Sequence, residues 1–417
     1  MNQLNAPLTI QRNLSIWWVV SLFVVLATVL VLIKGNFTSN IKNWEKTQQI
    51  MPKADCVGIT CMRVGSIVLG NGIRVIYDGV AGMLFVDPKT SFMADKSPWD
   101  YPVPEEKEKA FVGDTVVFIA ARIICLLPLL WLTIQSFHGF IGRTVFLFLA
   151  FMTLSGWPAP IIDLFFLISS SLVDWPLSYY LFAQRMHNVY DFATVGFICL
   201  LALYLSRARA LRWWEIVGIV LFGQLIFENN GIMTGVALFV FSIIEPHIQS
   251  RKGRILTAIQ RISVAAAASL ALALFFIWNY QLVPESYGVD RGALTPLGNV
   301  IEYFKQYWTR YGFYNFSWLN VTIANLVTMV IIPTILGAIA GLISGWEQLI
   351  SKNQPTNNSR TVSKAAFSAA CGFFSTLVIG LFVSGLSSDM GRQAVPLALM
   401  VLLAATKYSE TFTQRKS

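Results

Sequence analysis

Four short polar segments interrupt an otherwise apolar chain, and their side chains could bind a phosphate next to a sugar. They run from 184 to 191, from 228 to 230, from 284 to 320 and from 387 to 396. Arginine forks match phosphate oxygens, and the third segment also sets Lys and Arg among aromatic rings that suit a sugar. The candidate substrate-binding residues in these segments are Gln184, Arg185, His187, Asn188, Asn229, Arg310, Asp389 and Arg392.

Each of these segments also has a purely structural explanation. Arg185 could extend its charge to a membrane surface, and Asn229 fits the tight turn of a helical hairpin. Asp389 and Arg392 are spaced to pair with each other on a helix. An aromatic belt at a membrane surface would account for the tyrosines and tryptophans of 284–320. The sequence leaves both explanations open.

The chain contains no familiar motif of a soluble enzyme. Its candidate catalytic residues are three carboxylates. Glu228 lies in a turn that its Asn and Gly neighbours already explain, so it is either a solvated side chain or a substrate contact. Asp78 and Asp100 lie in a long polar stretch with other aspartates, any of which could be an ordinary loop carboxylate. The chain has only three histidines, and neither a metal nor a cofactor is expected.

The composition requires most of this chain to lie in a membrane. Of its 417 residues, 55% are hydrophobic and 13% are charged, and its mean hydropathy is +0.60. In soluble domains about a quarter of all residues are charged. The net charge is +9, but the basic residues lie in short connectors, so we expect no nucleic-acid partner. The sequence predicts an all-α polytopic membrane protein.

About ten transmembrane helices are predicted, since a span needs about 20 mainly apolar residues. The basic connectors all fall on one side if both termini are cytoplasmic, as the positive-inside rule requires. The run 160–186 is apolar enough to be another span. Counting it as a span would move every later connector, with its basic residues, to the other side of the membrane. We therefore expect it to lie on the outer face or to re-enter there. The predicted spans are 16–33, 114–134, 144–159, 189–206, 214–230, 231–245, 263–283, 321–345, 366–386 and 393–406.

Three regions follow from this layout. Residues 1–34 form a cytoplasmic tail and the first span, and residues 35–112 form a folded extracytoplasmic loop domain with a strand-like or helical stretch near 73–77. Residues 113–417 form the multi-span domain, with the interfacial segment 160–188 and the outer loop 284–320. In the first loop Cys56 and Cys61 are either a disulfide or two free thiols.

The layout resembles the GT-C superfamily of membrane glycosyltransferases, which use polyprenyl-phosphate sugars. The likeness is best across about 155–245, where Gly156-Trp-Pro-Ala-Pro160 leads through Ala183-Gln-Arg-Met-His-Asn188 into a span and a basic turn. Arg392-Gln-Ala-Val-Pro396, followed by an apolar run, is similar to the last segment of that superfamily. In size, span count and re-entrant segment the chain also resembles bacterial serotype-modifying glucosyltransferases.

The resemblance implies an inverting transfer of sugar from a polyprenyl-phosphate donor to a glycan acceptor, such as lipid-linked O-antigen. Asp78, with Asp100 as second choice, would be the general base that deprotonates the acceptor hydroxyl. Arg185, Arg310 or Arg392 would hold the phosphate of the leaving group. The reaction would take place on the extracytoplasmic face, most simply of a bacterial inner membrane.

Three other functions are compatible with the sequence. An O-antigen polymerase or ligase would act on similar lipids but typically relies on outer loops richer in arginine. A transporter of lipid-linked glycans or other solutes would need charges buried within its spans. The spans near 114–134, 189–206 and 263–283 carry almost none between their ends apart from Arg122, which favours a surface active site over transport. A long first loop without a catalytic role would also suit a non-enzymatic membrane assembly subunit.

Overall fold

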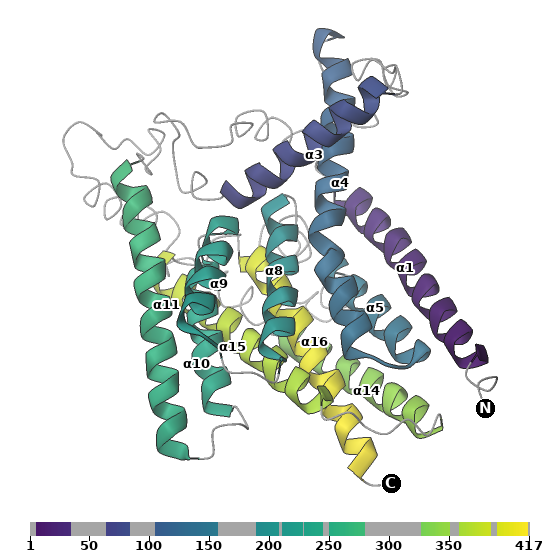
Figure 1. Cartoon of the computed structure of the whole chain (residues 1–417), viewed down its shortest axis with the longest axis vertical. Coiled ribbons are helices and arrows are strands. Elements are labelled where there is room, and N and C mark those ends of the chain that lie inside the picture. Colours follow the sequence, from purple (N-terminus) through teal and green to yellow (C-terminus); the bar gives the residue numbers. More distant parts are fainter. Residues whose placement is uncertain are drawn as a thin grey trace, which may run out of the picture.

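The computed structural model describes ten stretches of the chain, and all of their regular structure is helical (Figure 1). These residues contain no strand, as the all-α prediction requires. The described stretches are 6–34, 64–83, 105–156, 189–207, 211–227, 229–244, 250–279, 327–350, 358–384 and 390–415. Their helices are α1 (Ala6–Lys34), α3 (Val64–Met83), α4 (Glu105–Ser136), α5 (Phe140–Ser155), α8 (Val189–Leu205), α9 (Trp213–Ile226), α10 (Asn230–Ile244), α11 (Arg251–Asn279), the π-helical turn η4 (Val327–Ile331), α14 (Ile332–Ile350), α15 (Asn358–Ser384) and α16 (Met390–Arg415).

Four of the described helices are long and apolar enough to cross a membrane. Their apolar segments are Ser15–Leu32, Ile119–Ser136, Lys252–Phe276 and Met329–Ile350. These helices are compatible with an integral membrane protein. Each of the ten predicted spans overlaps a helix, but α5, α8, α9 and α10 have only 14 to 17 residues. The count of ten spans, the cytoplasmic termini and the bacterial inner membrane therefore stay predictions.

Helix α3 occupies the stretch that the sequence left open between strand and helix. Leu69, Ile73 and Tyr77 recur every four residues, which places them on one face of a helix. Ile73 is buried in the main core, and Leu69 and Tyr77 pack against it. The helix contacts α4, α8 and α9 and lies across one end of the bundle (Figure 1). Packing of this apolar stripe explains why a glycine-rich segment folds as a helix.

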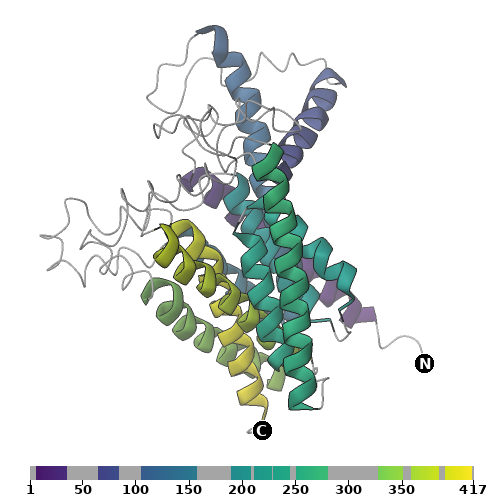
Figure 2. The ribbon, with the colours of Figure 1, turned by 90° about the vertical axis from the view of Figure 1, so that its left-hand side faces the viewer.

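The beginning of α1 and the end of α16 lie at the opposite end of the bundle from α3 in both views (Figures 1 and 2). Helix α8 lies inside the bundle, since residues 191–199 are buried without interruption. It approaches α4 closely because Gly196 has no side chain, and a Cβ there would overlap the carbonyl oxygen of Cys125. This close packing holds the middle of α8 against α4.

Helices α14 and α16 are held together by a stripe of glycines. Gly337, Gly341 and Gly345 follow one another every four residues and face α16, where a Cβ at Gly341 would overlap the carbonyl oxygen of Thr406. Small residues at this spacing let two helix backbones approach each other closely. The contact makes α14 and α16 a rigid pair.

A buried ion pair lies near the C-terminal end of α16. Lys407 Nζ is 2.5 Å from Glu410 Oε2, and both side chains are fully buried. Gln348 of α14 donates to the same carboxylate, and the Lys407 ammonium lies 3.9 Å from the centroid of the Phe137 ring. Lys407 is part of the last basic group in the sequence, but its charge is neutralised inside the protein. It therefore adds nothing to the surface charge at this end.

Candidate functional site

Three of the predicted site residues lie in the described part of the chain. Asp78 is in α3, Asn229 directly precedes α10, and Arg392 is in the first turn of α16. Cys56, Cys61 and the segment 160–186 lie outside the described residues. So do the predicted site residues Asp100, Gln184, Arg185, His187, Asn188, Glu228, Arg310 and Asp389.

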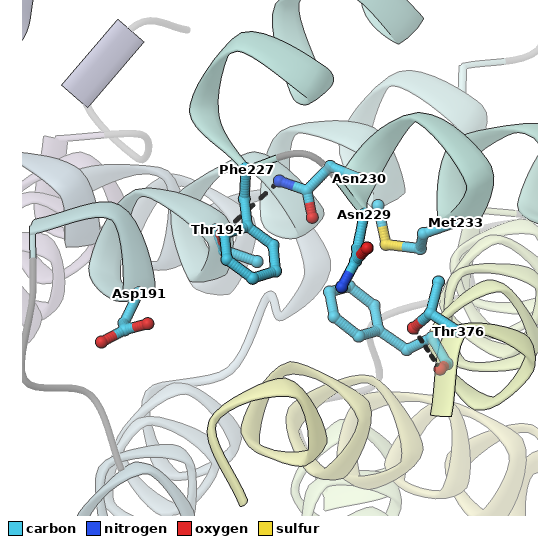
Figure 3. Close-up of a pocket in the computed structure, with 8 residues that line it drawn as sticks. Asp191, Thr194, Phe227, Asn229, Asn230, Met233 and Thr376 are labelled. Carbon is cyan, nitrogen blue, oxygen red and sulfur yellow. Dashed lines mark hydrogen bonds between the residues drawn. The ribbon is translucent and has the colours of Figure 1, made fainter. Parts of the chain in front are cut away.

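A small cavity lies where the start of α8, the α9–α10 turn and α15 meet, and both polar and apolar side chains line it (Figure 3). Its volume of about 10 Å³ is room for about one water molecule. Phe227 and Asn229, the sequence neighbours of Glu228, both contribute to its wall. The cavity can therefore hold a water or a single functional group of a larger ligand. It is lined by Asp191, Thr194, Phe227, Asn229, Asn230, Met233, Phe373 and Thr376.

The α9–α10 turn positions two amide side chains at this cavity. The backbone N–H of Asn230 donates to Phe227 O at 2.9 Å, and the N–H of Met233 donates to Asn229 O at 3.1 Å, which begins α10. The side chain of Asn230 is 1% exposed, and its Nδ2 donates to Thr194 Oγ1 on α8 at 3.4 Å. Asn230 Oδ1 accepts no hydrogen bond from the described residues, so it can accept one from a ligand or a water.

A carboxylate and a guanidinium lie together beside these amides. Asp191 is buried in the first turn of α8, where the helix dipole favours a negative charge. Arg122, fully buried in α4, interacts electrostatically with Asp191, and its guanidinium carbon lies 5.2 Å from the centroid of the Phe192 ring. Charged side chains within apolar helices are costly and commonly functional. This pair is the strongest sign of a function in the described residues.

Of the three predicted positions that the structure describes, Asn229 lines this cavity, whereas Asp78 and Arg392 do not. Helix α3, which carries Asp78, contacts α8 and α9, and helix α16, which carries Arg392 in its first turn, contacts α8. The structure therefore places one of these three predicted residues at the cavity and the other two on helices that pack against its helices.

The sequence analysis did not select two residues of this site. Asp191 could be explained as an ordinary helix start, and Arg122 was noted only as an exception within a predicted span. The available signal was the combination of an arginine inside one apolar run and an aspartate at the start of a later apolar run. Nothing in the sequence alone says that these two positions face each other.

The site can form hydrogen bonds and hold charge, and it offers little to a metal ion. The amides of Asn229 and Asn230 can both donate to and accept from hydroxyl groups. Within the described stretches, no three His, Cys, Asp or Glu side chains lie close enough to hold a metal. The arrangement can therefore bind one hydroxyl group or one water molecule.

The chain matches no protein-family model, no curated protein and no solved structure.

Proposed function

We propose that the protein is an integral membrane glycosyltransferase that transfers a sugar from a polyprenyl-phosphate donor to a glycan acceptor. The reaction takes place at the end of the bundle covered by α3, which is the predicted extracytoplasmic face. The observation that supports this best is Asp191, which interacts electrostatically with the buried Arg122 and lines one cavity together with the amides of Asn229 and Asn230. A sugar needs polar groups of this kind to bind its hydroxyls. The apolar helices around them favour a donor that is linked to a lipid.

The proposed reaction needs a base and a way to stabilise a leaving phosphate. A carboxylate takes the proton of an acceptor hydroxyl, the hydroxyl oxygen forms a bond to the anomeric carbon, and the polyprenyl phosphate leaves with the electrons of the broken bond. Asp78 on α3 and Glu228 in the α9–α10 turn are the proposed bases, with Asp100 as a further candidate. Arg392, together with Arg185 and Arg310, would stabilise the charge of the leaving phosphate.

The test is the mass of surface glycans in cells that express the wild type or a variant at equal membrane abundance. A hexose-sized increment with the wild type that disappears with Asp78→Asn or Glu228→Gln supports the transferase and identifies its base. Glu347→Gln is the matched control, because it removes a carboxylate at the other end of the bundle, beside the start of α5. If the wild type changes no glycan, the proposal is wrong.

A transporter is the second candidate, and the same two buried charged residues favour it. Transport requires charges buried within spans, and Arg122 and Asp191 are both buried between α4 and α8. Reconstituted vesicles distinguish the two functions. A transporter moves a labelled polyprenyl-linked sugar across the bilayer without an acceptor, whereas a transferase releases polyprenyl phosphate only when an acceptor is present.

A further inference from the structure

A long groove lies between α14 and α15, with α16 as its floor, and it shares no lining residue with the small cavity described above. Both helices pack on α16 and leave a cavity of about 1,190 Å³ between them. The groove follows α16 from Leu397 to Phe412, which is about 22 Å of helix. This length exceeds half the thickness of a bilayer core, which is about 30 Å in total.

The hydroxyl groups that line this groove donate to backbone carbonyls of the protein itself. Ser363 Oγ donates to Ala404 O at 3.1 Å, Thr334 Oγ1 donates to Val330 O at 2.6 Å, and Ser375 Oγ donates to Gly372 O at 2.7 Å. These hydroxyl protons are already used within the protein, so the walls offer few donors to a ligand.

Four large aromatic side chains line the groove and are about half exposed or more. The exposed fractions are 51% for Phe367, 45% for Phe374, 68% for Tyr408 and 50% for Phe412. Such a continuous apolar surface marks a place where a hydrophobic partner binds. A long hydrocarbon chain lying along α16 would cover these rings.

Positive charge gathers at one end of the groove. Arg360 and Lys364, one turn apart on α15, both line it. Lys364 Nζ donates to Ile244 O at 3.1 Å, and Arg254 of α11 donates to Ile243 O at 3.3 Å, so both cations lie at the carboxyl end of α10. Burial, followed by the positive charges of Arg360 and Arg254, lowers the pKa of Lys364. An anion bound here would relieve this repulsion.

We propose that the groove binds an anionic membrane phospholipid, with its acyl chains along α16 and its phosphate against Arg360 and Lys364. The proposal rests on the membrane location proposed above but not on the glycosyltransferase activity. The basic residues also lie in the connectors predicted to face the cytoplasm, where anionic headgroups attract Lys and Arg. The groove shares no lining residue with the small cavity, and the ligand proposed for it is a different one.

The experiment measures binding of phosphatidylglycerol and of phosphatidylcholine to the purified full chain in detergent by native mass spectrometry. We expect phosphatidylglycerol to bind more tightly. Arg360→Gln and Lys364→Gln should each weaken its binding about fivefold, since a basic residue near a lipid surface contributes about that much. Lys252→Gln, an exposed cation at the same end that does not line the groove, should leave the binding unchanged.

A pair of tryptophan variants tests the groove itself. Ala338→Trp places a large side chain in the groove and should abolish lipid retention, whereas Ile335→Trp, on the exposed face of the same helix, should retain it. Equal binding of the two lipids, or unchanged binding in Arg360→Gln, Lys364→Gln and Ala338→Trp, would overturn the proposal. So would a dimer in solution that Ala338→Trp dissociates, or retention of polyprenyl phosphate in place of phospholipid.

Discussion

The residue that most constrains this protein is Arg122, because a guanidinium buried in an apolar helix requires a counter-charge. Asp191 supplies it from the first turn of α8. Asp191→Asn would leave the charge of Arg122 buried and uncompensated, which typically costs about 3–5 kcal/mol. We expect this loss in the free energy of unfolding, measured by denaturant titration in mixed micelles.

A double-mutant cycle separates this pairing from a general loss of packing. Arg122→Met combined with Asp191→Asn removes both charges, so the double variant should lose less stability than the sum of the two single variants. Additive losses would show that the two side chains do not interact. Lys252→Gln, at the other end of the bundle, is the control for a simple change of net charge.

At the scale of elements, the contact between α14 and α16 depends on small residues. Gly341→Ala introduces a Cβ that overlaps the backbone of Thr406, so the helices must separate, at a cost of about 1–3 kcal/mol. Gly218→Ala on α9 is the matched control, since a Cβ there meets nothing within 4 Å and should stabilise the helix by about 0.5–1 kcal/mol. Thermal unfolding followed by tryptophan fluorescence compares the two, and equal effects would contradict this account of the contact.

Element type could be predicted from the sequence wherever the apolar run was long. The predicted runs at 16–33 and 114–134 fall within α1 and α4. Hydropathy over a window of about 20 residues is enough to predict such long apolar helices. The segment near 73–77 could not be assigned in the same way, since its glycines weaken any local preference. Packing on α4, α8 and α9 makes it a helix, and this information is absent from its local sequence.

At the scale of the whole molecule, the bundle has a basic end and an end covered by α3. If the protein spans a membrane as proposed, Gly79→Cys on α3 and Lys252→Cys on α11 should lie on opposite sides. In a background with serine at Cys56, Cys61 and Cys371, a membrane-impermeant maleimide added to intact cells should label Gly79→Cys at once. It should label Lys252→Cys only after permeabilisation, and equal labelling of both in intact cells would contradict the predicted topology.

The candidate site was accessible to sequence reasoning only in part. Asn229 and Asp78 were selected because polar groups next to apolar runs need an explanation. Helix α3, which carries Asp78, contacts α9, which leads into the turn of Asn229, but only Asn229 lines the cavity. Asp191 was not selected because its position alone fits a helix start. Its significance comes from Arg122, and the sequence does not show which helix faces of α4 and α8 are in contact.

The sequence by itself determined the helical class, the apolar segments and the gathering of basic residues in connectors. These are local properties, because hydropathy and charge act over one helix length. The tertiary structure alone decided that Arg122 faces Asp191, that Lys407 is buried against Glu410, and that α14 and α15 leave a groove between them. Those features depend on which faces of distant helices meet, and close packing over the whole bundle determines that.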